Sequence, residues 1–399
     1  MLNVTEAKQI ITANTVALTP AECPLRSASG KILAADVYAI MDIPAFPQSS
    51  MDGYAFLYNE WKQNKILELE GEIAAGNNQQ NILAAGKAAR IFTGAPVPPG
   101  ADTVVMQEKV IIHTSANAAK ELMIEDEAIQ QGTNVRPKGS EIKKGALALE
   151  KGSLLSPAAI GFLAGIGITT VQVFPDPAIR IIITGNELQQ AGAPLEYGQV
   201  YESNSATLTA ALQQLHLENV KIYKAVDDLK AVTAVLATAL QQSDMVLLTG
   251  GISAGDYDFV LQATENCGVT KLFHKIKQRP GKPLYFGKKE NKLVFGLPGN
   301  PSSVLTCYYE YVLAAIEILT LRKVSLQCIH VPLQKSFSKS AVLTHFLKGY
   351  FDGTTVSILD AQESYRLSSF ARANCFVKID EAVTTCAAGE IMEVHLLPV

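Results

Sequence analysis

A glycine-rich loop after a buried strand is the segment of the chain best suited to chemistry. In VLLTGGISAGDYDFV (246–260), an apolar run gives way to glycines, a serine and two aspartates before a helical pattern resumes. Glycines let backbone N–H groups approach an anion, a serine hydroxyl can donate to a phosphate oxygen, and the following helix start adds partial positive charge. The P-loop and dinucleotide-binding motifs are absent. The loop is expected to bind a phosphate-bearing ligand through Thr249, Gly250, Gly251, Ser253 and Gly255.

Two carboxylates accompany this loop. Asp227 and Asp258 each follow the end of a predicted strand. Carboxylates beside a phosphate site suit Mg²⁺, with waters and substrate completing the octahedron. Both aspartates are therefore expected to be Mg²⁺ ligands. Asp227 also suits the N-cap of the helix that follows, so this alternative role stays open.

A basic segment follows at HKIKQRPGKPLYFG (274–287). Lys275, Lys277 and Arg279 alternate, which in an extended chain places them on one side. Lys277 suits the protection of a sheet edge. Arg279 and Lys282 flank a stiff Pro-Gly pair, and two fixed cations at that place suit an oxyanion.

The elements that must position these residues are strands alternating with helices between residues 177 and 325. Such alternation predicts βαβ units and a mainly parallel sheet with helices on both faces. Ligands bind outside the carboxyl ends of the strands in such sheets. The loops 184–187, 227–228, 249–258 and 296–301 are therefore expected to meet at one edge as a binding site.

The whole chain is predicted to be a multidomain α/β plus β protein with a central three-layer α/β domain. An Asn-capped helix near residue 4 and the apolar spacing up to residue 40 predict a helical N-terminal region, with a second helix near residue 157 returning beside the first. An Asp352-Gly353 hairpin turn indicates a small, β-barrel-like terminal domain. The predicted domains are 1–40 with 146–176 (helical linker), 41–145 (small β domain), 177–325 (α/β domain) and 326–399 (C-terminal β domain).

Composition excludes several classes of protein. The 399 residues carry a net charge of −4, which argues against nucleic-acid and membrane-surface binding. The six cysteines and six histidines show neither a C-x-x-C nor an H-E-x-x-H motif. The N-terminus lacks an apolar signal core, and the most apolar stretch is shorter than a ~20-residue membrane span. A reduced, cytoplasmic protein is expected.

The chain resembles the molybdopterin molybdenumtransferases, the MoeA family, which includes the gephyrin E domain. The words SSMDGYA, FTGAPVPPGAD, VVMQE, TGNEL, YESN, TGGISAGDYD, RPGKP, GLPGNP and SSFARANC follow in family order over nearly the whole chain. The resemblance implies a four-part homodimer whose third domain has the fold of the molybdopterin adenylyltransferases. It implies insertion of molybdate into adenylylated molybdopterin with Mg²⁺, releasing AMP and molybdenum cofactor. Transient contact with other proteins of that pathway is implied too, without nucleic-acid or membrane partners.

The resemblance also assigns site residues. Arg279 stands where a Lys is common and Glu141 where an Asp is usual, and Asn186 and Glu202 replace common aspartates. The catalytic set it implies is Asp52, Glu141, Glu187, Asp227, Asp258 and Lys282. The further substrate-binding set is Lys275, Arg279, Pro298, Gly299, Asn300, Ser303, Lys348 and Ser369, beside the glycine loop.

Two alternatives remain on the sequence alone. One is the adenylyltransferase step, whose enzymes share the central fold but lack the flanking domains. The other is a binding or scaffold role, as in the gephyrin E domain. The presence of Asp52, Asp258 and Lys282 favours an enzyme. Molybdate and tungstate are tetrahedral dianions of nearly equal size, so both fit the expected site.

Overall fold

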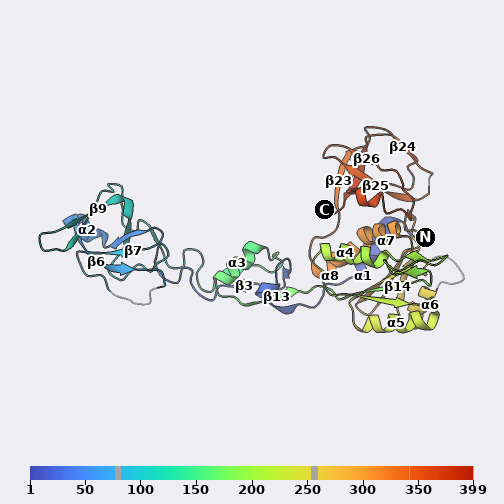
Figure 1. The fold of residues 1–399 in the computed structure, drawn as a ribbon, viewed down its shortest axis with the longest axis horizontal. Coiled ribbons are helices and arrows are strands. Elements are labelled where there is room, and N and C mark those ends of the chain that lie inside the picture. Colours follow the sequence, from blue (N-terminus) through green and yellow to red (C-terminus); the bar gives the residue numbers. More distant parts are fainter. Residues whose placement is uncertain (77–81, 253–258, 341, 399) are drawn as a thin grey trace. The chain divides into compact units, whose positions relative to one another are not determined.

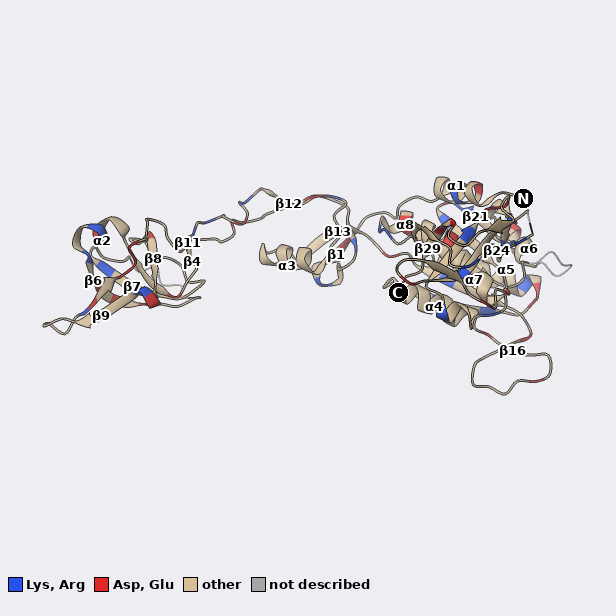
Figure 2. Cartoon of the chain, turned by 90° about the horizontal axis from the view of Figure 1, so that it is seen from above, with Lys and Arg blue, Asp and Glu red and all other residues tan. Residues whose placement is uncertain are grey.

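The computed structural model describes residues 1–76, 82–252, 259–340 and 342–398. The chain divides into two compact units (Figure 1). Unit 1 comprises Met1–Ala21 and Val173–Val399, and unit 2 comprises Glu22–Gln172. Basic and acidic residues are mixed along both units, in keeping with the small net charge (Figure 2).

Unit 1 is built on a six-stranded mixed sheet. Four neighbouring strands are parallel. The fifth strand runs antiparallel to both of its neighbours, so the sixth, at the edge, has the direction of the first four, and the mainly parallel sheet is confirmed. The last two strands flank the RPGKP segment, which the sequence had indicated only as extended. In spatial order the strands are β17 (Val220–Ala225), β14 (Ile179–Thr184), β18 (Met245–Thr249), β22 (Lys292–Leu297), β21 (Tyr285–Lys289) and β19 (Thr270–His274).

Helices cover both faces of this sheet, which makes the predicted three layers. Strand β14 is an unbroken apolar run because it is buried on both sides: Ile182 belongs to one core, Ile181 and Ile183 to the other. Figure 1 shows α5 and α6 below the sheet and α1, α4 and α7 above it. The helices are α5 (Leu229–Gln241) and α6 (Phe259–Asn266) on one face, and α1 (Val4–Asn14), α4 (Asn204–Gln214), α7 (Pro301–Cys307) and α8 (Leu313–Thr320) on the other.

The last of these helices is continuous from Pro301 to Thr320, since one π-helical turn, η3 (Tyr308–Val312), joins α7 to α8. In the described part of the chain it alone is long and apolar enough to cross a bilayer, but 72% of its 18-residue apolar stretch is buried inside the protein. Its side chains belong to the larger apolar core. It is therefore placed as a core helix.

A second sheet, from the C-terminal residues, lies beyond the α7 layer (Figure 1). The predicted hairpin turn is confirmed between β25 and β26, where Gly353 has φ +101°. Strand β20 (Gln278–Arg279) pairs in parallel with β25, so the basic segment joins this sheet. The other strands are β23 (Gln327–Pro332), β25 (Thr344–Phe351), β26 (Val356–Ile358), β27 (Cys375–Ile379) and β29 (Ile391–Leu396), with a small pair β24 (Phe337–Ser338) and β28 (Thr385–Cys386).

Unit 2 holds a mixed six-stranded sheet and, nearer its ends in the sequence, three small sheets of two or three short strands. The six strands are β8 (Thr103–Met106), β5 (Gly53–Phe56), β7 (Lys87–Ile91), β6 (Ile66–Ile73), β10 (Lys120–Ile124) and β9 (Val110–Thr114), with α2 (Tyr58–Asn64) beside them. The shorter strands are β4 (Gln48–Ser49) with β11 (Val135–Arg136), β3 (Val37–Tyr38) with β12 (Leu147–Leu149), and β13 (Thr170–Phe174) between β1 (Ala21–Pro24) and β2 (Ile32–Leu33).

The helical expectation for residues up to 40 is wrong beyond Asn14. The capping box of Asn3 and Glu6 is confirmed, but residues 21–38 form short strands and one 3₁₀ turn. Their apolar spacing fits both periods, and pairing with strands more than a hundred residues away decided the outcome. Helix α3 (Pro157–Gly165) packs on that 3₁₀ turn, whereas α1 packs on α8. The predicted domain of residues 1–40 with 146–176 crosses the division between the two units, which falls after Ala21 and after Gln172. The four predicted domains stay predictions.

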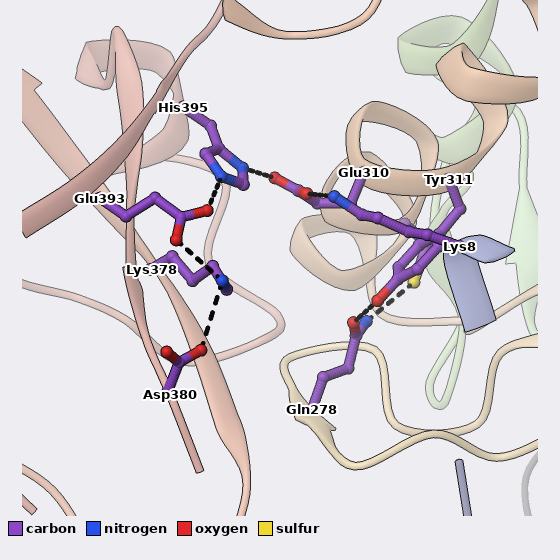
Figure 3. A network of polar contacts seen from close by, with 9 residues as sticks. Lys8, Gln278, Glu310, Tyr311, Lys378, Asp380, Glu393 and His395 are labelled. Atoms are coloured by element: carbon purple, nitrogen blue, oxygen red, sulfur yellow. Dashed lines mark hydrogen bonds and ion pairs between the residues drawn. The ribbon is translucent and has the colours of Figure 1, made fainter. Parts of the chain in front are cut away.

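One chain of ion pairs fastens the C-terminal sheet to the α/β layer (Figure 3). The buried carboxylate of Glu310, in the π-helical turn, contacts Lys8 Nζ at 2.6 Å and His395 Nδ1 at 2.7 Å. Burial alone would raise the pKa of Glu310, but Lys8 and His395 hold it below its ordinary value. Glu393 then links His395 to Lys378, at 2.9 Å on each side. The network thus joins α1, the core helix, β29 and β27.

Replacing Glu310 by glutamine should destabilise unit 1 by about 3–5 kcal/mol, because Lys8 and His395 lose the buried anion between them. The measurement is urea unfolding of the full chain. Asp380→Asn is the control: its carboxylate, at the exposed end of the same network, contacts Lys378 at 3.3 Å and should contribute at most about 1 kcal/mol. Equal losses in the two variants would contradict the role given to Glu310.

Candidate active site

A cavity of about 650 Å³ lies in unit 1 at the carboxyl ends of β14, β18 and β22. It brings together loops that the sequence predicted to meet at one sheet edge. The C-terminal segment 362–365 supplies a further wall. Predicted site residues that line it are Glu187, Asp227, Gly250, Gly251, Arg279, Lys282, Pro298, Gly299, Asn300 and Ser303.

The cavity floor is bare backbone from two loops. At Gly250, φ is +86° and an added Cβ would lie 2.7 Å from the Thr184 carbonyl oxygen, so only glycine fits. Asn204 Nδ2 donates to the Gly299 carbonyl at 2.9 Å and fixes the GLPGNP loop. That loop opens the long core helix, whose N-terminus and nearly buried Ser303 therefore face the cavity.

Asp227 lines the cavity and does not cap the helix that follows it, because its neighbour performs the capping. Asp228, not Asp227, is the N-cap of α5 and accepts from the Ala231 N–H at 2.9 Å. The alternative role left open for Asp227 is thus excluded. Asp227 and Asn186 instead make a reciprocal pair, in which Asn186 Oδ1 accepts the Asp227 N–H at 3.1 Å. A neutral amide at this position adds no repulsion beside the Asp227 carboxylate.

Arg279 and Lys282 stand on a loop braced from behind. Both are exposed and line the cavity, and neither has an ion-pair partner within the described ranges. Behind them Gln278 is fully buried: its Oε1 accepts from the Tyr311 hydroxyl and its Nε2 donates to the Gly281 carbonyl at 3.3 Å. Gly281 has φ +90°, and a Cβ there would lie 2.5 Å from Cys307 Sγ. The core helix therefore sets the position of both cations.

The wall formed by residues 362–365 belongs to a loop that a buried lysine holds in place. Lys348 is 2% exposed, and its Nζ donates to the carbonyls of Ala361 at 2.8 Å and Arg366 at 3.1 Å. Ser369 Oγ donates to the same Ala361 carbonyl at 2.7 Å. Burial lowers the pKa of the Lys348 ammonium group. Lys348 and Ser369, which the resemblance placed on substrate, thus position the loop and do not line the cavity.

Two other predicted substrate-binding residues, Lys275 and Thr249, do not line the cavity. Lys275 lies off the cavity: its φ of +70° breaks the extended run, so the expected alternation with Lys277 and Arg279 is wrong. Lys277 pairs with Glu381 at 3.6 Å. Thr249 is buried beneath the floor, where its backbone carbonyl accepts from the Thr184 hydroxyl. Ser253, Gly255 and Asp258 lie outside the described residues.

Asp52 and Glu141 belong to unit 2. Asp52 links the SSMDGYA and FTGAPVPPGAD motifs: its Oδ1 accepts hydrogen bonds from both the N–H and the hydroxyl of Thr93, each at 2.7 Å. Those contacts hold the pKa of the Asp52 carboxyl below its ordinary value. Glu141 is exposed, and nearby Lys138 pairs with Asp42 at 3.4 Å. Both predicted carboxylates are therefore solvent-accessible within their unit.

Sequence reasoning missed Gln278 and most of the 362–365 wall. Gln278 carried no charge to attract notice, although its place between two predicted cations was a usable signal. Glu363 and Tyr365 lie in a polar stretch that, taken alone, is typical of a surface loop. The Asn300 amide donates to the Ser364 hydroxyl at 2.8 Å, which ties this wall to the GLPGNP loop.

Tyr311→Phe should weaken binding of a tetrahedral oxyanion such as molybdate roughly three- to tenfold, the cost of one hydrogen bond that positions the 279–282 loop. Calorimetric titration checks this. The matched control is Tyr308→Phe, in which another buried tyrosine of the same helix loses its hydrogen bond, 3.1 Å, to the Ala211 carbonyl on the far side. Parallel losses in both variants would show a general packing effect instead.

Comparison with known proteins places every part of the chain. Residues 2–167 match the family model described as "MoeA N-terminal region (domain I and II)", residues 180–318 "Probable molybdopterin binding domain", and residues 330–397 "MoeA C-terminal region (domain IV)". The chain is 32% identical over 384 residues to a molybdopterin molybdenumtransferase of Haemophilus influenzae, covering 94% of each chain. It is 32% identical to a Staphylococcus aureus protein of the same name over 98% of this chain and 95% of that one.

Solved structures agree. A molybdopterin biosynthesis MoeA protein from Pyrococcus horikoshii has a TM-score of 0.82 at 30% identity, covering 99% of each chain. A second structure of a protein so named from that organism has a TM-score of 0.75 at 27% identity and full coverage of both chains. With this cavity, these matched regions and this extent of identity, the chain belongs to the MoeA family of molybdopterin molybdenumtransferases.

Proposed function

We propose that the protein inserts molybdate into adenylylated molybdopterin, releasing AMP and the molybdenum cofactor. The observation that carries the proposal is the unit 1 cavity, where a bare glycine floor, the carboxylates of Asp227 and Glu187 and the cations of Arg279 and Lys282 converge. A phosphate-bearing pterin and a metal oxyanion are the two ligands that such a combination suits.

The residues present fit Mg²⁺ as the cofactor. The donor set is carboxylate oxygen, which this hard cation prefers. Asp227 would hold it, with Asp258 from the glycine loop. Within the described residues, the Asp227 carboxylate accepts only a long contact, 3.4 Å from the Asn186 N–H, and so retains free oxygen lone pairs. When bound, Mg²⁺ would neutralise negative charge on the phosphate oxygens.

The role proposed for the protein side chains is to bind the two substrates and orient them toward each other. Arg279 and Lys282 would hold the molybdate dianion, with the Ser303 hydroxyl as a neutral donor, beside the dithiolene of the pterin. The backbone of the glycine loop would hold the adenylate phosphate. Cleavage of the phosphoanhydride by water or by a molybdate oxygen then needs positioning and charge neutralisation rather than a side-chain nucleophile.

We also propose that the working site is shared by two chains of a homodimer. The acidic residues that the family resemblance implies are distributed over both units: Asp52 and Glu141 in unit 2, Asp227 and Glu187 in unit 1. A two-fold dimer would create two equivalent sites, each with unit 2 residues from the partner. We propose further that the dimer works in the cytoplasm and makes transient contacts with other enzymes of cofactor synthesis.

Molybdate-dependent AMP release from adenylylated molybdopterin tests the function. Lys282→Ala should raise the molybdate concentration needed for half-maximal turnover roughly ten- to a hundredfold, because a charge-assisted contact of ~1.5–3 kcal/mol is lost. Pterin binding should change much less. The control is Lys277→Ala, a nearby lysine outside the cavity. If pterin binding were lost and the molybdate dependence kept, the roles would be reversed; no AMP release by the wild type would refute the enzyme.

Subunit mixing tests the shared site. Asp52→Ala and Asp227→Ala proteins should each be inactive, and random exchange makes about half of the dimers mixed. A mixed dimer has one intact site if the two residues come from different chains, so about a quarter of wild-type activity should return. If each site were built from a single chain, every site would contain one of the two substitutions and no activity would return. Mass-verified mixed dimers without AMP release would therefore exclude sharing.

A further inference from the structure

Four side chains of the types that ligate metals share one face of the C-terminal sheet. Cys328 of β23 lies directly opposite His395 of β29, and His330 lies opposite Glu393. Residues paired across antiparallel strands, and residues two apart on one strand, point to the same face. Cys-x-His on one strand and Glu-x-His on the next thus form a two-by-two array of thiol, imidazole and carboxylate. The sequence showed no such cluster because its two halves are more than sixty residues apart.

Three of these groups are already close together. The Cys328 sulfur, a Glu393 oxygen and a His395 ring nitrogen lie within 4.8 Å of one another. Metal–ligand distances of about 2.0–2.3 Å place the ligand atoms of a tetrahedral zinc site between three and four ångströms apart. The three ligand atoms are thus within about an ångström of that spacing, and exposed His330 lies beside them, opposite Glu393.

The orientation of His395 is fixed by a second carboxylate. Its Nδ1 contacts Glu310 at 2.7 Å, and Lys8 holds the other oxygen of Glu310 at 2.6 Å. His395 Nε2 is consequently turned toward Glu393 (Figure 3). A carboxylate on the far nitrogen is the usual support of a metal-binding histidine. In this chain the support is buried, whereas the ligand side opens to solvent.

A metal ion can reach the array. Strand β23 is the edge of its sheet, and Cys328 on it is exposed. A cavity of about 490 Å³, separate from the candidate active site, is lined by Glu393 and His395 together with Lys8 and Lys378. Lys378 contacts Glu393 at 2.9 Å and would remain an outer partner of that carboxylate.

We propose that Cys328, Glu393 and His395, with His330, form a binding site for a borderline divalent transition metal of the Zn²⁺ class. One thiolate with imidazole and carboxylate suits Zn²⁺ and Co²⁺ better than Mg²⁺ or Ca²⁺, which take oxygen ligands. Binding replaces the thiol proton of Cys328 and the His395–Glu393 hydrogen bond by metal–ligand bonds, so protons are released. The site is independent of the proposed transferase reaction.

Titration of the full-length, chelator-treated protein with Co²⁺ alone tests the proposal. One equivalent should produce a thiolate-to-cobalt charge-transfer band in the near ultraviolet, which Zn²⁺ then abolishes by displacement. Cys328→Ser should lose the band. His330→Ala should weaken Co²⁺ binding by roughly tenfold or more, because loss of a residue that only supports a metal ligand already weakens metal binding by about that factor. Both side chains are exposed, so neither variant threatens folding.

Cys23→Ser is the matched control, because Cys23 is the other cysteine that is not buried. It should keep the band at wild-type affinity. The proposal would be overturned if no thiolate band formed, if the band followed Cys23 instead, or if Cys328→Ser left it intact. Unchanged Co²⁺ affinity in both His330→Ala and Glu393→Gln would overturn the four-ligand set in favour of a lone surface thiol.

Discussion

The arrangement of unit 1 depends on one buried carboxylate in its core helix. Glu310 satisfies Lys8 from the N-terminal helix and His395 from the last strand, so three distant parts of the chain meet at one charge. A buried carboxylate without these partners would be strongly unfavourable, which makes their docking obligatory for this helix. One residue further along the same π-helical turn, Tyr311 holds Gln278 and with it the cationic loop. The turn therefore couples the assembly of the sheets to the geometry of the cavity.

Exposed and buried basic residues have different surroundings at the cavity. Arg279 and Lys282 are exposed and free of ion pairs in the described structure, so their charge is available to a ligand. Lys348 is also a basic residue, but its ammonium group donates hydrogen bonds to backbone carbonyls of the loop that walls the cavity. A lysine ammonium group thus lines the cavity at Lys282, whereas at Lys348 it supports a loop. Burial and hydrogen-bond partners, rather than residue type, separate the two roles.

The neighbouring aspartates illustrate the same point on the acidic side. Asp228 turns to the Ala231 N–H and begins α5, whereas Asp227 projects into the cavity and pairs with Asn186 through its backbone. The departure from the usual family residue at Asn186 preserves this pairing, because an amide oxygen accepts the same N–H as a carboxylate would. The acidic edge carries one negative charge fewer as a result, so its negative potential comes from Asp227 and Glu187.

The sequence by itself determined the central sheet, its strand-end loops and the family. Long buried strands such as Ile179–Thr184 and glycine-rich loops after them carry local signals that survive without tertiary information. It did not determine residues 21–38, whose short apolar runs satisfy helix and strand alike until partners from 147–174 select a strand. Nor did it show that Gln278 braces the cations, that Lys348 is buried, or that Cys328 faces His395. Those facts depend on register and docking between segments far apart in the chain, and only the folded structure supplies both.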